Sequence, residues 1–498
     1  MQHTKLITIV FAALVFLTAL LSGPPSFDAT DGAEFAICGA NLQIAHAPGY
    51  PLFLLMIRFF SMLFSPVYGH LRLLNCFLAA LSAIIGIQAF KKNNISYFPA
   101  IAGLSLFLFS APIMSQFNSL EVYPLAIILV LSAMTLQNTK LSSYASGMAM
   151  FAGHPVALLV SPLFFKLKQK WYFYLLMLIP ISLFFYIPLR AGSCRIAHYG
   201  HPTTIHDLVG YFTMYSGRLN APLLERLLRS IKFINIPTGI ALLTLSIFGG
   251  KLTIKKDLPI FLAFLFLASY ELPDPAGQLW ILLLPLSLRA ASGIQNIFAR
   301  FQNKQNLFKI FILLVILISA VTGTIAADRT KDNIALTWTL DIMNSIPPNS
   351  VYRTVSHDTF YAAYAVYTLN IRPDIILSDP YGNFFEFSPP APISTSIGDR
   401  TVYISRAWNR TDDFSLHGLL FAPETIQTHS VNWNEFGIFI YEYSSPDPMA
   451  MDIVSEAWMR RMIQEEDETL RNYCYEMAMQ NAVTPTTRER IKNAQQNF

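Results

Sequence analysis

Residues 71–90 read LRLLNCFLAALSAIIGIQAF, an almost uncharged stretch that decides the fold class. An α-helix needs about 20 mostly apolar residues to cross the hydrocarbon core of a bilayer. Similar stretches recur along the first two thirds of the chain, whose 498 residues are 53% hydrophobic and only 13% charged. A soluble globular protein has about a quarter charged residues. The sequence therefore predicts a polytopic α-helical membrane protein.

The other candidate spans lie on both sides of this stretch. The first, residues 6–21, is interpreted either as a span or as the apolar region of a cleaved signal peptide. A Gly-broken pair over residues 144–165 predicts a hairpin, which brings the total to about eleven crossings. The remaining candidates are residues 98–113, 123–136, 172–189, 234–248, 258–272, 279–292 and 308–326.

The basic residues at the span ends predict the orientation. If the spans alternate, these residues all fall on one side, which the positive-inside rule identifies as the cytoplasm together with the N-terminus. The extracytoplasmic side of a bacterial inner membrane or endoplasmic reticulum then receives the first outer loop, 23–66, and the segments 115–121, 190–232 and 271–275. The basic residues are Lys5, Lys91, Lys92, Lys140, Lys166, Lys168, Lys170, Lys251, Lys255, Lys256, Arg300, Lys304 and Lys309.

The composition turns polar after Ala326, where a small extracytoplasmic α/β domain is expected. Residues 350–355, 359–369 and 374–378 read strand, helix, strand, which is a βαβ unit. We therefore divide the chain into a membrane domain, residues 1–327, and a soluble domain, residues 328–498. Further strands are expected at 401–405 and 437–443, and a charged helical stretch at 449–479, with Trp458 and Met462 in its core.

Charge and cysteine content exclude several classes of protein. The net charge is +4 and the basic residues do not form a continuous face, which disfavours nucleic-acid binding. Cys38, Cys76, Cys194 and Cys474 lack the spacing of a zinc site or of a disulfide-rich scaffold. We predict no metal and no cofactor.

The first outer loop contains paired carboxylates in Phe27-Asp-Ala-Thr-Asp-Gly-Ala-Glu-Phe35. If Asp31 begins a short helix, Glu34 lies one turn later and both side chains share a face. A carboxylate beside a partly dehydrated cavity can serve as a general base. The alternative interpretation is structural, with Asp31 as N-cap and Glu34 as its capping-box partner.

The same loop continues as His46-Ala-Pro-Gly-Tyr-Pro51, a rigid turn in which Gly49 permits a reversed backbone. It leads into residues 52–64, an amphipathic run that carries Arg58 and is typical of a helix lying in the membrane interface. A single loop histidine is usually structural, so a functional role for His46 depends on its context.

Three polar residues near the predicted outer ends of spans are further candidates. Glu121 is costly in a membrane unless it faces a cavity or pairs with a partner such as Arg190. Arg190 is placed either to bind a departing lipid phosphate or to reach a lipid headgroup. His154, inside the predicted hairpin, is either a core histidine or a proton carrier.

In their order along the chain, these motifs resemble the membrane O-mannosyltransferase-like family of unknown function within the GT-C glycosyltransferases. The family loop reads roughly D-x-x-E-F and then H-x-P-G-x-P. The resemblance covers nearly the whole chain. Its further matches are Glu121-Val-Tyr123, Gly153-His154, Tyr186-Ile-Pro-Leu-Arg-Ala191, Tyr199-Gly-His-Pro202, Ser345-Ile-Pro-Pro-Asn-Ser350, Ser356-His-Asp-Thr-Phe360 and Ile371-Arg-Pro-Asp374.

The resemblance implies transfer of a sugar, such as mannose, from a polyprenyl-phosphate donor to a hydroxyl of a protein or glycan acceptor. The sugar would invert, with Asp31 or Glu34 as the catalytic base. At residues 199–202 the chain departs from the family, where a Trp and an Asn or Asp are expected, and this leaves the acceptor open. The residues implied to bind donor or substrate are His46, Tyr50, Arg58, Glu121, Tyr123, His154, Arg190 and His201.

Two other functions fit the same composition. Charged groups and broken spans also occur in a transporter or flippase of an amphiphilic lipid. A non-catalytic scaffold, whose soluble domain binds a partner, is the third interpretation. A transporter needs access from both sides of the membrane, whereas the candidate groups of this chain gather on one side. This asymmetry favours the enzyme.

Overall fold

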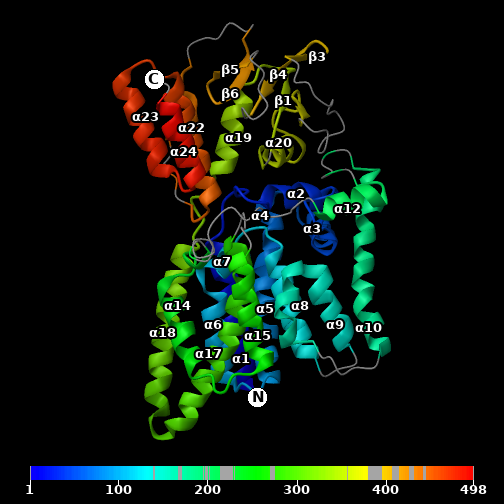
Figure 1. The fold of residues 1–498 in the computed structure, drawn as a ribbon, viewed down its shortest axis with the longest axis vertical. Coiled ribbons are helices and arrows are strands. Elements are labelled where there is room, and N and C mark those ends of the chain that lie inside the picture. The colour runs from blue at the N-terminus through cyan, green and yellow to red at the C-terminus, as the bar shows by residue number, and fades with distance from the viewer. Residues whose placement is uncertain are drawn as a thin grey trace.

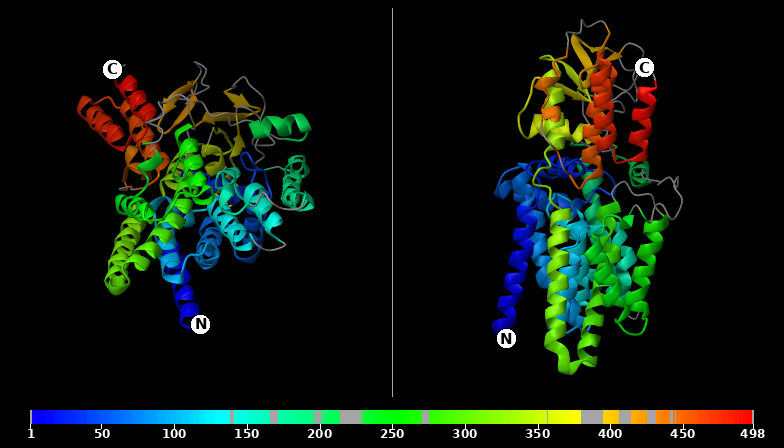
Figure 2. Two further views of the ribbon diagram at one scale, coloured as in Figure 1. Left: turned by 60° about the horizontal axis from the view of Figure 1, so that its bottom comes forward. Right: turned by 90° about the vertical axis from the view of Figure 1, so that its left-hand side faces the viewer.

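The computed structural model is a bundle of apolar helices with a smaller domain stacked over one end (Figure 1). A view turned by 90° shows the same arrangement along the long axis (Figure 2). The N-terminus lies at the end of the bundle away from the small domain. The structure describes residues 2–137, 141–165, 171–194, 196, 200, 202–213, 228, 230–269, 275–355, 357–379, 395–405, 414–424, 431–440, 443 and 445–496.

The first part of the bundle follows the predicted apolar stretches. The quoted stretch forms most of α5 (Leu73–Lys92), and residues 123–136 form α8 (Tyr123–Leu136). Residues 98–113 fold as α6 (Tyr97–Leu108) and α7 (Ala111–Phe117), bent by 76° where Pro112 enters the first turn of α7. The other helices here are α1 (Gln2–Leu21), α2 (Gly32–Ala40), α3 (Pro51–Leu63), α4 (Tyr68–Leu71) and α9 (Ser142–Gly147).

The rest of the bundle is less regular. Residues 144–165 continue from α9 into a π-helix, Met148–Gly153, and a 3-10 helix, Pro155–Leu163. The prolines of this segment lack the backbone donor of a regular α-helix. The remaining elements are α10 (Trp171–Leu178), the 3-10 helices Ile179–Phe185 and Gln302–Lys304, α11 (Tyr186–Ala191), α12 (Ile205–Thr213), α14 (Ile236–Ile247), α15 (Ile254–Ser269), α16 (Pro275–Gln278), α17 (Trp280–Arg300) and α18 (Gln305–Ala326).

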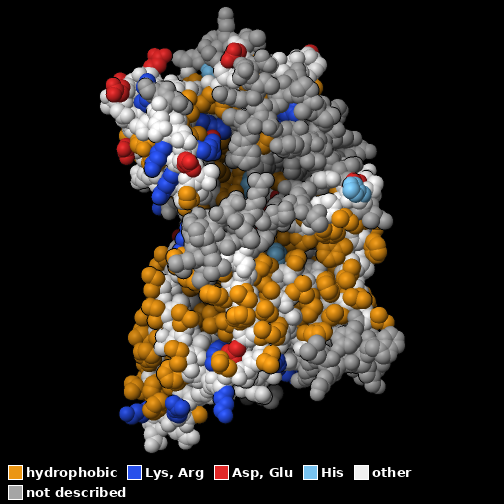
Figure 3. Space-filling model, viewed as in Figure 1, with side chains coloured by type: hydrophobic (Ala, Val, Ile, Leu, Met, Phe, Trp, Pro, Cys, Tyr) orange, Lys and Arg blue, Asp and Glu red, His pale blue; other side chains and the backbone are white. Residues whose placement is uncertain are grey.

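The surface of the bundle is that of a membrane protein. Within the described residues, four helices are long and apolar enough to cross a bilayer, or five if the bent α6–α7 pair is one span. Outer helices such as α18 expose leucines at about half of their surface, for example Leu313 and Leu314. Figure 3 shows a broad hydrophobic band across the visible face of the bundle, with Lys and Arg side chains at the end away from the small domain. Lipid is the natural solvent for this band.

The small domain confirms the predicted α/β pattern. The predicted unit folds as β1 (Val351–Arg353), α20 (His357–Tyr367) and β2 (Ile376–Ser378), and β1 also pairs in parallel with β4 (Arg400–Ile404). The strand order is β2-β1-β4-β6-β5, with antiparallel β5 and β6 and with β3 on β4. The other elements are α19 (Ile334–Ser345), β3 (Ser396–Ile397), β5 (Phe414–His417), β6 (Leu420–Pro423), the 3-10 helix Trp433–Glu435, α21 (Gly437–Ile440), α22 (Pro448–Gln464), α23 (Glu468–Asn481) and α24 (Pro485–Gln495).

Two predictions for this domain need correction. The strand expected at residues 437–443 is wrong, because Gly437–Ile440 forms the helical turn α21. The Asp341 carboxylate accepts hydrogen bonds from the backbone N–H groups of Gly437 and Ile438, which favours a helix start. The helical stretch 449–479 is broken where Asp467 caps α23. Trp458 and Met462 are buried, as predicted.

A buried ion pair joins the two parts of the molecule. Asp28, in the first loop, is fully buried, and its Oδ2 atom lies 3.3 Å from Nη1 of Arg329, just after α18. The same carboxylate accepts hydrogen bonds from the hydroxyl of Tyr68 and from the backbone N–H of Thr30. In addition, Tyr361 of α20 donates a hydrogen bond to the Ala29 carbonyl. The first loop is therefore fixed between the bundle and the small domain.

The ion pair predicts a large loss of stability for Arg329→Leu. The substitution leaves Asp28 buried without its cation, which costs roughly 3–5 kcal/mol. Thermal unfolding in detergent measures this loss. Lys331→Leu, at an exposed position two residues later, is the matched control and should unfold near the parent. Equal melting temperatures for Arg329→Leu and the parent would contradict the assignment.

Candidate active site

The side chains of Asp31, Glu34 and His46 converge at the beginning of α2. His46 Nδ1 lies 3.0 Å from Oε2 of Glu34, and His46 Nε2 lies 3.7 Å from Oδ2 of Asp31. The backbone N–H of His46 donates a hydrogen bond to Oε1 of Glu34. The imidazole thus lies between the two carboxylates that the sequence singled out. The structure brings these three predicted site residues together.

The capping-box interpretation of the two carboxylates is wrong. Asp31 precedes α2, but its side chain makes no capping hydrogen bond to any described residue. Glu34 reaches forward to His46 instead of back to the backbone of Asp31. The side chain of Glu34 is 3% exposed, whereas that of Asp31 is 32% exposed. Asp31 is therefore the more accessible carboxylate.

The two carboxylates hold a proton on His46. Burial lowers the pKa of His46, but the charges of Glu34 and Asp31 and the hydrogen bond to Glu34 outweigh burial and raise this pKa to about 9. At neutral pH the ring is therefore an imidazolium. The ligand atoms of these three residues lie within 4.8 Å of one another, a spacing that could also hold a metal ion. A metal would first have to displace the His46 proton.

Aromatic rings pack beside this cluster. Tyr50, at the start of α3, lies 5.3 Å from the His46 ring and stacks on His154 at 5.7 Å between ring centroids. Tyr123, at the start of α8, also lies beside His154, with 5.2 Å between the ring centroids. The Nδ1 atom of His154 accepts a hydrogen bond from the backbone N–H of Val156. The structure thus places three more predicted residues against the cluster, with His154 in a structural setting.

The loop that carries His46 is held by hydrogen bonds to its backbone. The Arg190 Nε atom of α11 donates to the Leu42 carbonyl at 2.9 Å, and the Tyr186 hydroxyl donates to the Gln43 carbonyl. Tyr211 of α12 donates to the Ala45 carbonyl. Arg190 therefore contacts the first outer loop just after α2, at the end of this helix away from Asp31 and Glu34.

Glu121 does not contact Arg190, the partner suggested by the sequence, among the contacts described, and Arg58 lies away from the two carboxylates. The Glu121 carboxylate accepts a hydrogen bond from the Thr30 hydroxyl at 2.9 Å, so its partner lies in the first loop. Arg58 donates to the Ala40 carbonyl at the C-terminal end of α2, whereas Asp31 and Glu34 lie at the N-terminal end of this helix. His201 lies outside the described residues.

Sequence reasoning missed four polar residues of this region. Asp28 and Thr30 belong to the quoted loop, but no spacing rule distinguished them from other loop residues. Gln116 lies in α7, and Arg329 directly follows α18. Arg329 could have been noticed in the sequence, because it follows a predicted span on the side opposite the lysine-rich span ends. The positive-inside rule predicts few basic residues on that side.

Comparisons with known proteins agree with this geometry. Residues 31–186 match the model of the protein O-mannosyl-transferase TMEM260 N-terminal domain. No curated protein sequence was found to match the chain. The matched residues contain Asp31, Glu34, His46, Glu121 and His154, which confirms the resemblance indicated by the sequence motifs.

Solved structures show a similar fold. ArnT from Cupriavidus metallidurans is similar in the apo state, with a TM-score of 0.50 and 13% identity, and bound to undecaprenyl phosphate, with a TM-score of 0.51 and 14% identity. Each likeness covers 75% of this chain and 85% of ArnT. The mycobacterial arabinofuranosyltransferase AftD is also similar, at 13% identity and a TM-score of 0.41, over 71% of this chain and 29% of AftD.

The fold is thus similar to that of ArnT, and residues 31–186 match the model of a protein O-mannosyl-transferase domain. Both comparisons support the interpretation of this chain as an enzyme that transfers a sugar.

The shifted pKa of His46 predicts how stability depends on pH. An unfolded histidine titrates near 6.5, whereas the pKa of folded His46 is about 9. The folded state binds the proton more tightly, so this stabilisation is fully present below about pH 6.5 and is lost as pH rises through about 9. Thermal unfolding from pH 6 to 10 should show the parent above His46→Gln at low pH, with a gap that closes near pH 9. His70→Gln, at an exposed position, is the control, and a gap independent of pH would contradict the assignment.

Proposed function

We propose that this protein transfers a hexose such as mannose from a polyprenyl-phosphate donor to an acceptor hydroxyl, with Asp31 as the catalytic base. The observation that carries the proposal is the unequal exposure of the two carboxylates. Glu34 is buried and bound to both the ring and the backbone of His46. Asp31 keeps about a third of its side chain accessible. Asp31 can therefore approach a substrate, and Glu34 is a positioning residue.

The reaction follows from this assignment. The Asp31 carboxylate accepts the proton of the acceptor hydroxyl as its oxygen attacks the anomeric carbon of the donor sugar. The new carbon–oxygen bond forms on the face opposite the lipid phosphate, so the sugar inverts. The bond from the anomeric carbon to the phosphate oxygen breaks, and its electron pair leaves with the polyprenyl phosphate. One proton and one sugar are transferred for each lipid phosphate released.

Charge stabilisation of the leaving phosphate is assigned to Arg190. A guanidinium pairs well with phosphate oxygens, and it needs no metal for this task. The Nε contact with Leu42 holds Arg190 beside the loop that carries His46. ArnT, which shares the fold, was solved with undecaprenyl phosphate bound, and this supports a polyprenyl phosphate as the lipid carrier. We assign no cofactor to the reaction, and the acceptor is a protein or a glycan.

We infer that the reaction occurs on the extracytoplasmic side of the membrane. The first outer loop and the small domain share one end of the bundle (Figure 1), and within the membrane domain the Lys and Arg side chains seen in Figure 3 lie near the other end. If the shorter apolar helices also count as spans, residues 1–327 form a membrane domain with about eleven crossings. An odd number of crossings and a cytoplasmic N-terminus would then put residues 328–498 on the extracytoplasmic side.

Asp31→Asn should lower the turnover number by roughly 100-fold or more, because an amide cannot accept the acceptor proton. The assay follows release of lipid phosphate from undecaprenyl-phosphate mannose by the reconstituted protein. Glu34→Gln should have a smaller effect on turnover and should shift the pH at which His46 loses its proton.

The matched control for this assay is Asp328→Asn, which changes an exposed carboxylate at the start of the small domain. It should retain the activity of the parent. Full transfer by Asp31→Asn would rule out Asp31 as the base, and full loss in Glu34→Gln alone would transfer the role to Glu34.

The orientation is tested by labelling introduced cysteines in sealed vesicles. The four native cysteines are buried, so background labelling is low. Thr469→Cys in the small domain should react with a membrane-impermeant maleimide added on the extracytoplasmic side, whereas Asn303→Cys at the opposite end should react only after permeabilisation. The reverse pattern would place the small domain in the cytoplasm.

A further inference from the structure

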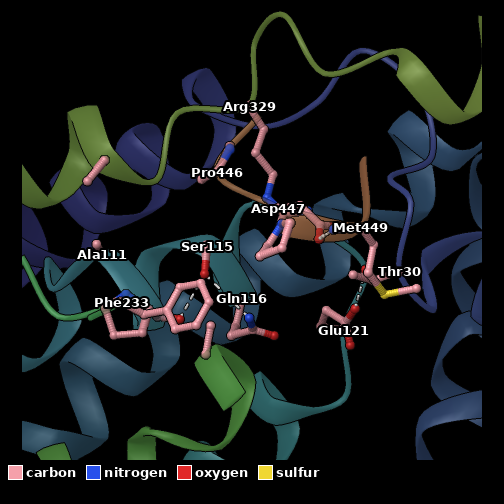
Figure 4. Close-up of a pocket in the computed structure, with 14 residues that line it drawn as sticks. Thr30, Ala111, Ser115, Gln116, Glu121, Phe233, Arg329, Pro446, Asp447 and Met449 are labelled. Carbon is pink, nitrogen blue, oxygen red and sulfur yellow. Dashed lines mark hydrogen bonds between the residues drawn. The ribbon is translucent and has the colours of Figure 1, made fainter. Parts of the chain in front are cut away.

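A cavity lies between the first loop, α7 and the beginning of α22. It has about 610 Å³ of empty space, including the part open to solvent. Figure 4 shows Gln116 and Glu121 on its lower wall and Arg329 and Asp447 on its upper wall. The membrane domain and the small domain both contribute to its wall.

Several polar atoms of the cavity wall have no hydrogen-bond partner among the described residues. They are Oε1 of Gln116, Oδ2 of Asp447 and Nε of Arg329, all on buried side chains. More than 90% of buried polar groups in proteins are hydrogen-bonded. Gln116 and Asp447 offer acceptors, and Arg329 offers a donor. The cavity wall therefore has unused capacity for both kinds of hydrogen bond.

Two kinds of ligand, phosphate and metal ions, are disfavoured by the residues of the cavity wall. Arg329 is already paired with Asp28, so the Glu121 carboxylate leaves the wall with a surplus of negative charge, which disfavours phosphate. A metal ion is also disfavoured, because the only described group with metal-ligand spacing is the Asp31, Glu34 and His46 cluster. A neutral ligand with many hydroxyl groups remains, since hydroxyls both donate and accept hydrogen bonds.

Two further features fit a sugar ring. The ring of Phe233 and the side chain of Met449 line the cavity beside the polar groups (Figure 4), and they offer apolar contacts to the carbon-bound hydrogens of a sugar. Burial raises the pKa of Asp447 to about 7, although Arg329 opposes this shift. Near neutral pH its carboxyl group can therefore donate as well as accept a hydrogen bond.

We propose that this cavity is a sugar-binding subsite, in which Gln116 and Asp447 hydrogen-bond to hydroxyls of a hexose ring. The inference rests on the proposed function for its link to the reaction. Thr30, in the cavity wall, directly precedes Asp31 and donates a hydrogen bond to Glu121. A sugar in the cavity therefore lies next to the loop segment that carries the catalytic base. It is either the sugar of the lipid donor or a sugar of a glycan acceptor.

Gln116→Leu is the variant that tests the subsite. Leucine has a similar size, and the Oε1 atom that it removes has no partner among the described residues, while Nε2 makes one long hydrogen bond of 3.4 Å to the neighbouring Ser115 hydroxyl. The lost hydrogen bond should weaken binding of a methyl glycoside about tenfold. Binding of the methyl glycosides of mannose, glucose and galactose to the detergent-solubilised protein is measured by saturation-transfer NMR. Gln302→Leu, at an exposed position in the 3-10 helix before α18, is the matched control.

A second measurement distinguishes the two sources of the sugar. If the subsite holds the donor sugar, Gln116→Leu should raise KM for undecaprenyl-phosphate mannose about tenfold when water is the acceptor. If it holds an acceptor sugar, this KM stays unchanged while glycoside binding is lost. Phe233→Leu, which removes the aromatic ring and no hydrogen bond, should weaken glycoside binding in the same direction.

Glycoside binding also separates this inference from the proposed function. A parent protein that binds a glycoside but releases no lipid phosphate would contradict the proposed reaction and leave the subsite supported. Failure of all three glycosides to bind the parent, or equal binding by the parent and Gln116→Leu, would overturn the subsite. Binding of inorganic phosphate or calcium that Gln116→Leu or Phe233→Leu abolishes would overturn it as well.

Discussion

The arrangement of the candidate site depends on the burial of one carboxylate, that of Asp28. A buried charge is stable only when it is paired and hydrogen-bonded. One partner, Thr30, lies in the same loop, whereas Tyr68 in α4 and Arg329 after α18 come from distant parts of the chain. Satisfying this one group brings the end of the membrane domain, the start of the small domain and the first loop together. The first outer loop therefore has a fixed position instead of being an exposed connection.

A second buried carboxylate, that of Glu34 in the first turn of α2, is also satisfied by specific partners. The buried Glu34 carboxylate is satisfied by the backbone and ring of His46, which lies twelve residues later. The imidazolium neutralises one of the two carboxylates and leaves Asp31 at the edge of the site. The cluster thus contains one negative charge more than it has positive charges, next to a lipid-facing bundle. Such an asymmetric arrangement of two carboxylates is suited to a reaction in which only one of them exchanges a proton.

Much of this organisation could be predicted from local patterns. The apolar stretch 71–90 became α5, the βαβ pattern became β1, α20 and β2, and the pair of Asp31 and Glu34 indicated the site. The segment 437–443 was misassigned because its apolar residues suit a strand, whereas a carboxylate from α19 favours a helical turn. The capping-box alternative failed for a related reason. Spacing along the chain does not reveal that Glu34 has a competing partner at His46.

The sequence alone determined that lipid surrounds the first two thirds of the chain, because hydrophobicity and span length are additive properties of consecutive residues. It also determined which residue types were available for chemistry in the first loop. Only the tertiary structure decided which of them meet. The contacts of Asp28 with Arg329 and of Thr30 with Glu121 join residues far apart in the chain. Such pairings follow from the requirement that buried polar groups find partners in space, and this requirement leaves no periodic signal in the sequence.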